Sequence, residues 1–308
     1  MTIGVAAAGP GAGRAILEAL AAVEGFATGA VGGFLSFAAL DAEGRLRRAA
    51  VQRGGARALL ASGTLARAAL AAPRAVLMSS GPDRPEPLAQ FTPAREGVGL
   101  VTGHRFPNGL GRDGRPLGEA ALEALAAGAD PDASVRRVLD ANPDADAGLI
   151  VLAADGRLAL ADSAYVARFP DRGAHREGGT SGSVAVLHNA IRPRRSLAPL
   201  IGELVRERLV EAHPPMPRLE LASGIPVGHG RPGGIVIDAA ARAIALHLPA
   251  PCHGSGPCAA GFGPGAPVLR DGVVVGHAAA EPFLVVRDGR LETADGARRS
   301  RLPFVPVG

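Results

Sequence analysis

The stretch between Gly97 and Ser163 constrains the fold of this chain more than any other segment. It begins with an apolar run, 97–103, that leads into a cluster of polar side chains. Two segments with helical spacing follow, and then an apolar hairpin that turns at Asp155-Gly156. Asp-Gly supplies the positive φ angles that tight hairpins require. Hairpins mixed with helices in this way predict an α+β fold with largely antiparallel sheets.

Similar patterns predict the other elements of the first two thirds of the chain. Short apolar runs indicate strands, and apolar residues at helical spacing indicate helices. Asp130 is expected to cap the helix that Pro131 begins. Residues 80–96 hold four prolines and are predicted to form a loop. The remaining expected strands are 2–8, 34–40, 46–51, 75–79 and 182–188, and the expected helices are 14–24, 56–71, 117–127, 131–142 and 197–212.

The composition changes near residue 214. Pro214-Pro215 ends the preceding helix, and the rest of the chain is rich in glycine and proline, with short apolar segments between. The 308 residues suit one large domain or two modest ones. We therefore expect an α+β core over 1–213 and a β-rich C-terminal extension over 214–308, which either belongs to the same domain or forms its own.

The chain contains no lysine, and all 33 of its basic residues are arginine. Arginine stays protonated in proteins, so it can neither form a Schiff base nor act as a tuned amine base. This excludes pyridoxal-phosphate enzymes, class I aldolases, Ser-Lys hydrolases and Walker-A nucleotide triphosphatases, which need a lysine at the site. The arginines are scattered and aromatic residues make up only 3%. We therefore expect no nucleic-acid partner.

Location and cofactors are predicted from what the sequence lacks. It shows no signal-peptide pattern and no run of 18 apolar residues, which predicts a cytoplasmic protein without a membrane span. Cys252, His253 and Cys258 match no standard zinc spacing, so no metal is expected. The glycine-rich turn at 9–13 is similar to a dinucleotide fingerprint, but its third glycine comes one residue early. We expect no cofactor and a small-molecule substrate, and the sequence leaves a homo-oligomer open.

The first candidate site is the polar cluster that follows the strand 97–103. Thr102 or His104 is a candidate for the chemistry, and Arg105 is a candidate to hold a substrate carboxylate, because its planar guanidinium matches that group. Asn108 is a candidate to bind substrate or to stabilise an oxyanion. The alternative is a polar loop in which Asn108 sets a turn before Gly109.

Two further candidates follow. Asp146 begins a strand and could orient a histidine or bind a substrate amine, or it belongs to a turn. Thr180 lies in a glycine-rich loop before an apolar strand, where self-cleavage would make it a new N-terminus, or the loop is only a flexible connection. The same strand ends in His188 and Asn189, which are candidates for catalysis and substrate binding or for capping.

Thr2 is the last candidate nucleophile. Removal of Met1 would give Thr2 a free α-amine next to the expected strand 2–8. Such an amine has a pKa near 8 and can act as the base for the hydroxyl of its own residue.

Two motifs carry a resemblance to known families. Residues 97–172, with Gly97-Val98-Gly99, Ala127-Gly128, Pro131 and Asp155-Gly156-Arg157, resemble an uncharacterised bacterial family of the N-terminal-nucleophile (Ntn) hydrolase-like group. The hairpin 34–55 is similar to the one that follows the catalytic threonine of isoaspartyl peptidase/asparaginase proteins, although Phe34 stands where that pattern has threonine. The resemblance implies a layered αββα sandwich and cleavage of an amide bond.

The leading hypothesis is an Ntn-type amidohydrolase that acts on a small amide or amino-acid derivative. A threonine hydroxyl would attack the carbonyl group, and an α-amine, His104 or His188 would accept its proton. The alternative is a non-catalytic ligand-binding or assembly protein on the same fold, which Phe34 favours. A third hypothesis, a nucleotide-binding oxidoreductase, rests on residues 2–41. Convergence of His104, Asp146 and His188 would favour the enzyme.

Overall fold

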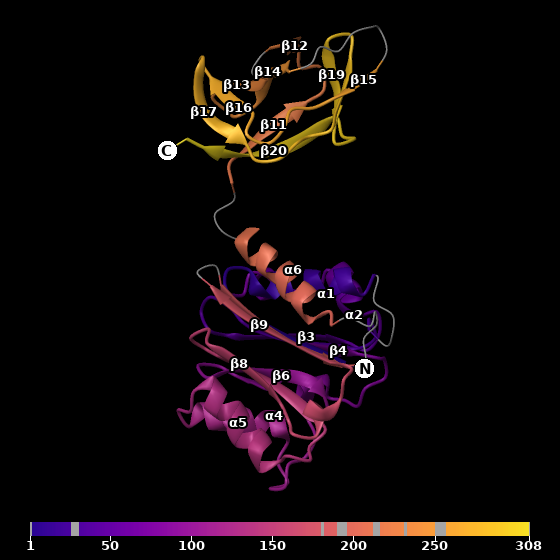
Figure 1. Cartoon of the computed structure of the whole chain (residues 1–308), viewed down its shortest axis with the longest axis vertical. Coiled ribbons are helices and arrows are strands. Elements are labelled where there is room, and N and C mark those ends of the chain that lie inside the picture. The colour runs from indigo at the N-terminus through magenta and orange to yellow at the C-terminus, as the bar shows by residue number, and fades with distance from the viewer. Residues whose placement is uncertain are drawn as a thin grey trace. The chain divides into compact units, whose positions relative to one another are not determined.

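The computed structural model describes residues 2–25, 31–179, 182–189, 196–211, 216–230, 233–249 and 257–307. The chain divides into two compact units, Met1–His213 and Pro214–Gly308 (Figure 1). Each unit has its own hydrophobic core.

The larger sheet of the first unit has the strand order β3-β2-β4-β1-β10-β9 in the described residues. All its neighbouring strands are antiparallel. β1 lies inside the sheet and all its residues are buried, which explains its continuous run of small and apolar side chains. The strands are β1 Thr2–Ala8, β2 Leu35–Leu40, β3 Leu46–Val51, β4 Arg74–Ser80, β9 Arg172–Gly179 and β10 Gly182–Asn189.

The second sheet of this unit has the order β5-β6-β7-β8 in the described residues and is also antiparallel. Its strands are β5 Ala94–Arg95, β6 Gly99–Arg105, β7 Ala147–Ala153 and β8 Leu158–Asp162. The predicted hairpin is confirmed as β7 and β8. Between Asp155 and Arg157 the chain turns through Gly156, which has a φ of 93°.

Helices contact both sheets. Helices α1 Ala12–Val23, α2 Gly55–Ala61, α3 Arg67–Leu70 and α6 Ala198–Glu211 lie with the larger sheet, and α4 Leu117–Ala126 and α5 Pro131–Ala141 lie with the smaller one. The predicted cap of α5 is confirmed, because the Asp130 side chain accepts a hydrogen bond from the Ala133 N–H at 2.8 Å. Two short 3₁₀ helices are η1 Leu88–Phe91 and η2 Val166–Arg168.

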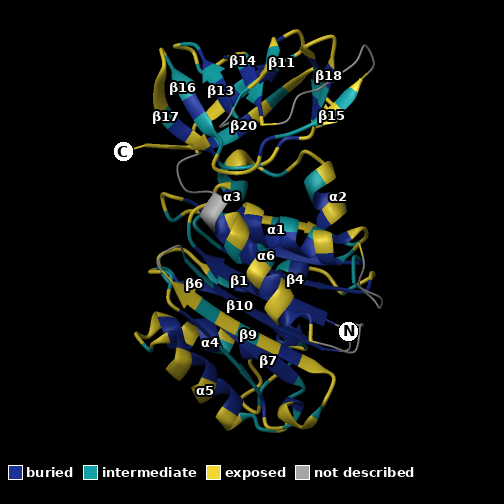
Figure 2. Ribbon diagram, turned by 45° about the horizontal axis from the view of Figure 1, so that its top comes forward, coloured by how far each residue is buried: buried dark blue, intermediate teal, exposed yellow. Residues whose placement is uncertain are grey.

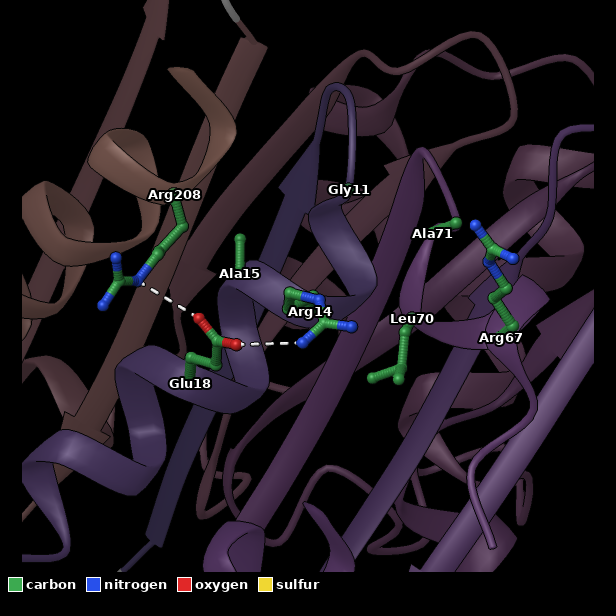
Figure 3. A pocket seen from close by; sticks show the side chains of 8 residues that line it. All are labelled: Gly11, Arg14, Ala15, Glu18, Arg67, Leu70, Ala71 and Arg208. Atoms are coloured by element: carbon green, nitrogen blue, oxygen red, sulfur yellow. Dashed lines mark hydrogen bonds and ion pairs between the residues drawn. The ribbon is translucent and has the colours of Figure 1, made fainter. Parts of the chain in front are cut away.

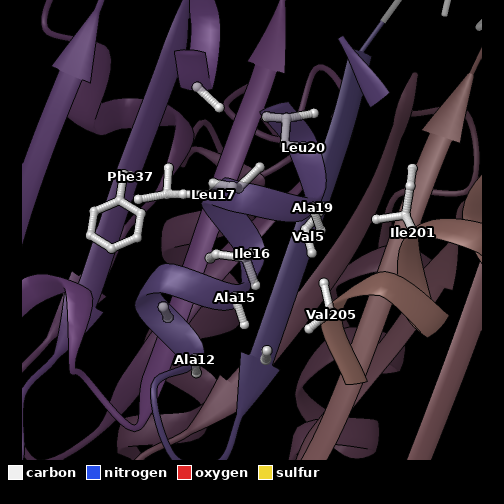
Figure 4. Packing of buried hydrophobic residues seen from close by; sticks show 14 of the residues in the cluster. Val5, Ala12, Ala15, Ile16, Leu17, Ala19, Leu20, Phe37, Ile201 and Val205 are labelled. Carbon is white, nitrogen blue, oxygen red and sulfur yellow. The ribbon is translucent and has the colours of Figure 1, made fainter. Parts of the chain in front are cut away.

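Three groups of buried side chains show how the first unit is layered. One lies between α1, α6 and the larger sheet and includes Ile16 and Ile201 (Figure 4). A second lies between the two sheets and includes Ala6 and Leu152. A third lies between the smaller sheet and α4 and α5. The order through the unit is therefore helices, sheet, sheet, helices, and the outward faces of helices such as α5 are exposed (Figure 2).

The alternation of side chains along β1 decides where Thr2 points. Ile3, Val5 and Ala7 belong to the core under the helices, whereas Ala6 and Ala8 belong to the core between the sheets. Because successive side chains on a strand point to opposite faces, Thr2 lies on the same face as Ala6 and Ala8. Its side chain therefore faces the second sheet.

The second unit is built from strands. The described residues form two sheets, in the orders β11-β20-β17-β16-β13-β14-β12 and β15-β18-β19. The Asp-Gly pairs at 271–272 and 288–289 have positive φ at both residues, which tight hairpins require. The strands are β11 Arg218–Ala222, β12 Val227–His229, β13 Gly234–Ile237, β14 Ala243–Leu248, β15 Cys258–Ala260, β16 Pro267–Arg270, β17 Val273–Ala278, β18 Leu284–Arg287, β19 Arg290–Ala294 and β20 Arg299–Pro306.

The predicted α+β class, with mainly antiparallel sheets and a β-rich C-terminal part, is confirmed. In the first unit, three expectations differ from the structure. The single helix expected over 56–71 is two helices, α2 and α3, and the loop 80–96 contains η1 and β5. β9 was not expected, because its polar and glycine residues form an exposed edge strand without an apolar run. Among the described residues, no helix is long and apolar enough to cross a membrane.

Candidate functional site

Thr2 lies at the start of β1 and only 5% of its surface is exposed. Its Oγ1 donates a hydrogen bond to Asn189 Oδ1 at 2.7 Å, and its backbone N–H donates to the same oxygen at 3.1 Å. The hydroxyl oxygen also accepts the backbone N–H of Arg105. The backbone N–H can only donate, so the Asn189 atom that it contacts must be the carbonyl oxygen. The hydroxyl and the nitrogen of Thr2 thus converge on one acceptor.

The strand register places these partners around Thr2. On one side Thr2 pairs with Asn189 of β10, and on the other with Ser80 of β4. Directly opposite residues of antiparallel strands point to the same face, so these side chains form a row facing the second sheet. Gly4 brings β6 close to β1, because a Cβ at Gly4 would lie 2.3 Å from the Gly103 carbonyl oxygen. This close approach allows the Arg105 backbone to contact Thr2.

Arg105 contacts Thr2 through its backbone and not through its guanidinium. Its φ of 62° is unusual for a residue other than glycine, and its N–H donates to Thr2 Oγ1. The guanidinium forms an ion pair with Asp146 and lies 4.6 Å from the centre of the Phe169 ring. The predicted carboxylate anchor is therefore already neutralised by Asp146, which neither orients a histidine nor stands free for a substrate amine.

His104 is fully buried beside this backbone and pairs with a carboxylate. Its Nε2 lies 2.7 Å from Asp162 Oδ1, and Asp162 Oδ2 accepts from Arg172 Nη1 at 3.0 Å. Both side chains meet over Gly148, the residue between them in the sheet. A Cβ at Gly148 would lie 2.3 Å from Asp162 Oδ1 and 2.4 Å from His104 Nε2. His104 thus fixes the end of β6 and shows no hydrogen bond to Thr2.

His188 lies on the opposite face of the larger sheet. It alternates with Asn189, and its Nε2 accepts the Leu197 N–H at 3.0 Å and lies 3.3 Å from Ser196 Oγ. These contacts hold the chain just before α6. Burial and the nearby His104 lower the pKa of His188 to about 4. A weak base that faces away from Thr2 does not fit the predicted proton acceptor, and the geometry assigns His188 a structural role.

The low pKa of His188 predicts a pH-dependent stability. The folded-state pKa of about 4 lies below the ordinary value of 6.5, so the unfolded chain binds the proton more readily. The contribution of neutral His188 to the free energy of unfolding is fully present above about pH 6.5. It is lost as the pH falls towards 4, which lowers that free energy by roughly 3 kcal/mol. Urea unfolding at pH 7 and pH 4 should show a steeper loss for the wild type than for His188→Gln. Equal losses of unfolding free energy in the two proteins would contradict this account. The two titratable groups that act on His188 are His104, which lowers its pKa, and Asp171, which raises it.

The other predicted residues do not join Thr2. Thr102 is fully buried and its Oγ1 donates to the Leu77 carbonyl oxygen at 2.9 Å, so its hydroxyl supports the contact between the sheets. Asn108 Nδ2 donates to Gln90 Oε1 at 2.7 Å. Thr180 lies outside the described residues. The expected convergence is absent from the described hydrogen bonds, since His104, Asp146 and His188 each have a different partner.

Sequence reasoning missed several residues around Thr2. Ser80 and Arg84 follow the predicted strand 75–79 but carried no recognised motif. Arg84 Nη2 donates to Ser80 Oγ, next to Thr2 in the row. Asp162 is the last residue of β8, the second strand of the predicted hairpin, and its polar character in an apolar strand was the available signal. Its partner Arg172 lies on the unexpected strand β9.

Groups of metal ligands and surface hollows are the other features of the described residues that could form a site. Among the described residues, no group of three or more histidine, cysteine, aspartate or glutamate side chains is placed to bind a metal ion. A hollow of about 340 Å³ lies beside Gly11, which belongs to the glycine-rich turn at 9–13 (Figure 3). There Glu18 pairs with both Arg14 and Arg208, at 3.2 Å each. Arg67 also lines the hollow, so Glu18 pairs with two of the three arginines around it.

Comparison with known proteins gives families without an assigned activity. A family model described as "Domain of unknown function (DUF6963)" matches residues 2–218, and one described as "Domain of unknown function (DUF7259)" matches residues 224–299. The first match begins at Thr2 and contains the whole site described above. No curated protein matches the chain.

Proposed function

The chain belongs to the DUF6963 family, and we propose that it is an amide hydrolase of the Ntn type with Thr2 as its nucleophile. One observation carries the proposal: the Thr2 hydroxyl and the Thr2 nitrogen both donate to Asn189 Oδ1. Cleavage of the Met1–Thr2 bond would make that nitrogen an α-amine beside the hydroxyl. An α-amine has a pKa of about 8, so a useful fraction is an unprotonated base near neutral pH.

The chemistry follows from these positions. Thr2 Oγ1 attacks the carbonyl carbon of the amide while the α-amine accepts its proton. The C–N bond breaks, the proton passes to the leaving amine, and the acyl group remains as an ester on Thr2. Water then cleaves the ester with the same amine as base, and the products are a carboxylic acid and an amine.

Two groups beside Thr2 suit the negative charge that develops on the carbonyl oxygen. The Arg105 N–H already points at the Thr2 hydroxyl, and its position is fixed by the His104–Asp162 hydrogen bond on one side of that peptide bond and the Arg105–Asp146 ion pair on the other. Asn189 holds its carbonyl oxygen towards Thr2, which leaves its amide nitrogen as a donor. Preorganised donors of this kind stabilise an oxyanion without reorganisation during the reaction.

The architecture supports the same proposal. The helix-sheet-sheet-helix order is the layering that the resemblance to Ntn hydrolases implies, and Thr2 lies at the end of a central strand with its side chain between the sheets. The buried His104–Asp162 pair keeps the adjacent strand ends rigid. We propose a small amide or amino-acid derivative as the substrate.

Labelling with an acylating probe tests the proposal. Two forms of the protein are prepared, one that begins at Thr2 and one that retains Met1, and each is treated with a β-lactone that acylates reactive hydroxyl groups. Intact mass should show one adduct on the first form and none on the second. Thr64→Ala removes an exposed threonine and should label like the wild type. Equal labelling of both forms would contradict the α-amine as base.

The non-catalytic alternative makes the opposite prediction in the same experiment. If neither form is labelled and no amide in a broad panel is cleaved, a ligand-binding protein on this fold becomes the better description. In that case the row of Thr2, Asn189 and Ser80 would serve to bind a ligand through hydrogen bonds.

A further inference from the structure

We propose that Arg84 binds a carboxylate group of the substrate beside Thr2. The inference deepens the proposed function and depends on it for the reaction, but carboxylate binding can be tested separately. Arg84 Nη2 donates to Ser80 Oγ, and Ser80 is the residue directly opposite Thr2 on β4. The guanidinium therefore reaches the row of side chains that contains the nucleophile.

Three described contacts hold Arg84 in place, in addition to its hydrogen bond to Ser80. The Gln52 side-chain amide brackets its backbone, accepting the Arg84 N–H at 3.0 Å and donating to the Arg84 carbonyl oxygen at 2.8 Å. The guanidinium carbon lies 5.9 Å from the centre of the buried Phe34 ring. A cation fixed in this way loses little conformational freedom when a ligand binds.

The charge of Arg84 has no carboxylate partner among the described residues. The adjacent acidic side chains are engaged elsewhere, since Asp83 pairs with Arg53 and Glu86 accepts from Gln52. The Nε of Arg84 is buried and has no hydrogen-bond partner among the described residues.

The other two arginines around the site differ in this respect. Arg105 pairs with Asp146 and Arg172 pairs with Asp162. Of these three guanidinium groups, Arg84 alone keeps an unbalanced positive charge within the described part of the chain. A planar guanidinium with free donors matches a carboxylate. Arg84 therefore takes the anchoring role that the sequence assigned to Arg105.

The spacing limits the substrate class. Opposite Cβ atoms in an antiparallel pair lie about 4.5–5.5 Å apart, and Arg84 contacts the side chain directly beside Thr2. A carboxylate bound to Arg84 is thus only a few bonds from a carbonyl carbon at Thr2 Oγ1. We infer a small amide that carries a carboxylate close to the scissile bond, such as an N-acyl amino acid.

Ligand-observed NMR at millimolar ligand tests the anion site with two matched probes, N-acetylglycine and its neutral analogue N-acetylglycinamide. The wild type should bind the first in preference to the second. Arg84→Gln should weaken N-acetylglycine binding by about 10–100-fold, because a charged hydrogen bond is lost, and should leave the neutral probe unchanged. Arg84→Lys keeps the charge and should show an intermediate loss.

Arg53→Gln is the matched control, since Arg53 is an exposed arginine of the same region that is paired with Asp83. It should bind both probes like the wild type. Equal binding of the two probes by the wild type, no binding of N-acetylglycine, or full retention by Arg84→Gln would each overturn the proposal. Thermal unfolding of Arg84→Lys checks that the variant is folded.

A Thr2→Val variant separates the two proposals. It should still prefer N-acetylglycine, because the anchor does not need the nucleophile. If β-lactone does not label the wild-type form that begins at Thr2, but the preference for N-acetylglycine remains, the hydrolase proposal fails and the carboxylate site stands. If labelling succeeds while the preference is absent, the nucleophile stands and the role of Arg84 is wrong.

Discussion

Replacing Thr2 by valine should reduce amide hydrolysis at least about a thousandfold while the protein remains folded, because loss of a nucleophile typically has an effect of this size or larger. Valine keeps the β-branched shape that suits a strand and keeps the α-amine, so only the hydroxyl is lost. The hydrogen bonds to Asn189 and Arg105 that involve the hydroxyl disappear with it. Steady-state turnover of a carboxylate-bearing amide, measured on the form without Met1, gives the result.

Two variants make the Thr2 result specific. Thr2→Ser keeps a hydroxyl and an α-amine and should retain measurable turnover. Thr102→Val removes the other hydroxyl that the sequence favoured, and turnover of this variant should stay within a fewfold of the wild type, because that hydroxyl is bonded to the Leu77 carbonyl. A Thr2→Val enzyme with wild-type turnover, or a Thr102→Val enzyme that is inactive yet folded, would show that Thr2 is not the nucleophile.

The second large effect is expected at Gly148. Its backbone lies outside the positive-φ region, so alanine is conformationally allowed there. The added Cβ would meet Asp162 Oδ1 at 2.3 Å and His104 Nε2 at 2.4 Å, which forces this buried pair apart. Overpacking and the disruption of a buried hydrogen bond to a carboxylate together should lower the free energy of unfolding by about 2–4 kcal/mol. Urea-induced unfolding followed by circular dichroism measures the change.

Gly179→Ala is the control for Gly148→Ala. Gly179 also lies in a strand of the first unit, but a Cβ added there would have no described atom within 4 Å. The unfolding free energy of this variant should remain near that of the wild type. If Gly148→Ala were equally neutral, the His104–Asp162 pair would not be a fixed part of the fold. The same Gly148→Ala variant should also lower turnover, because the Arg105 N–H follows His104 in β6.

Local patterns were sufficient where one strand or helix carries its own signal. The hairpin β7–β8 was predicted because an apolar run turns at Gly156, and α5 because Asp130 and Pro131 mark its start. The edge strand β9 gave no such signal, since β10 is its only neighbouring strand among the described residues. The helix expected over 56–71 ends early at Ala61, because the segment between α2 and α3 contains Gly63, with a φ of 65°.

The site was predicted only in part for a related reason. Thr2 and Asn189 were both singled out from the sequence, but their contact depends on the pairing of β1 with β10, 187 residues apart. Arg105 was chosen for its guanidinium, and the structure uses its backbone N–H instead. No local pattern shows which carboxylate neutralises which arginine, so Arg84 was overlooked.

The sequence by itself determined which chemistry this chain cannot carry. Without lysine it has no amine base except an α-amine, and its strand at 2–8 places a threonine where cleavage would expose one. Tertiary structure alone decided which polar groups meet. Side-chain alternation and strand register put Thr2, Asn189 and Ser80 on one face, whereas His188, one residue from Asn189, faces the helices. Contacts between distant strands are set by packing of the whole sheet, which no local segment encodes.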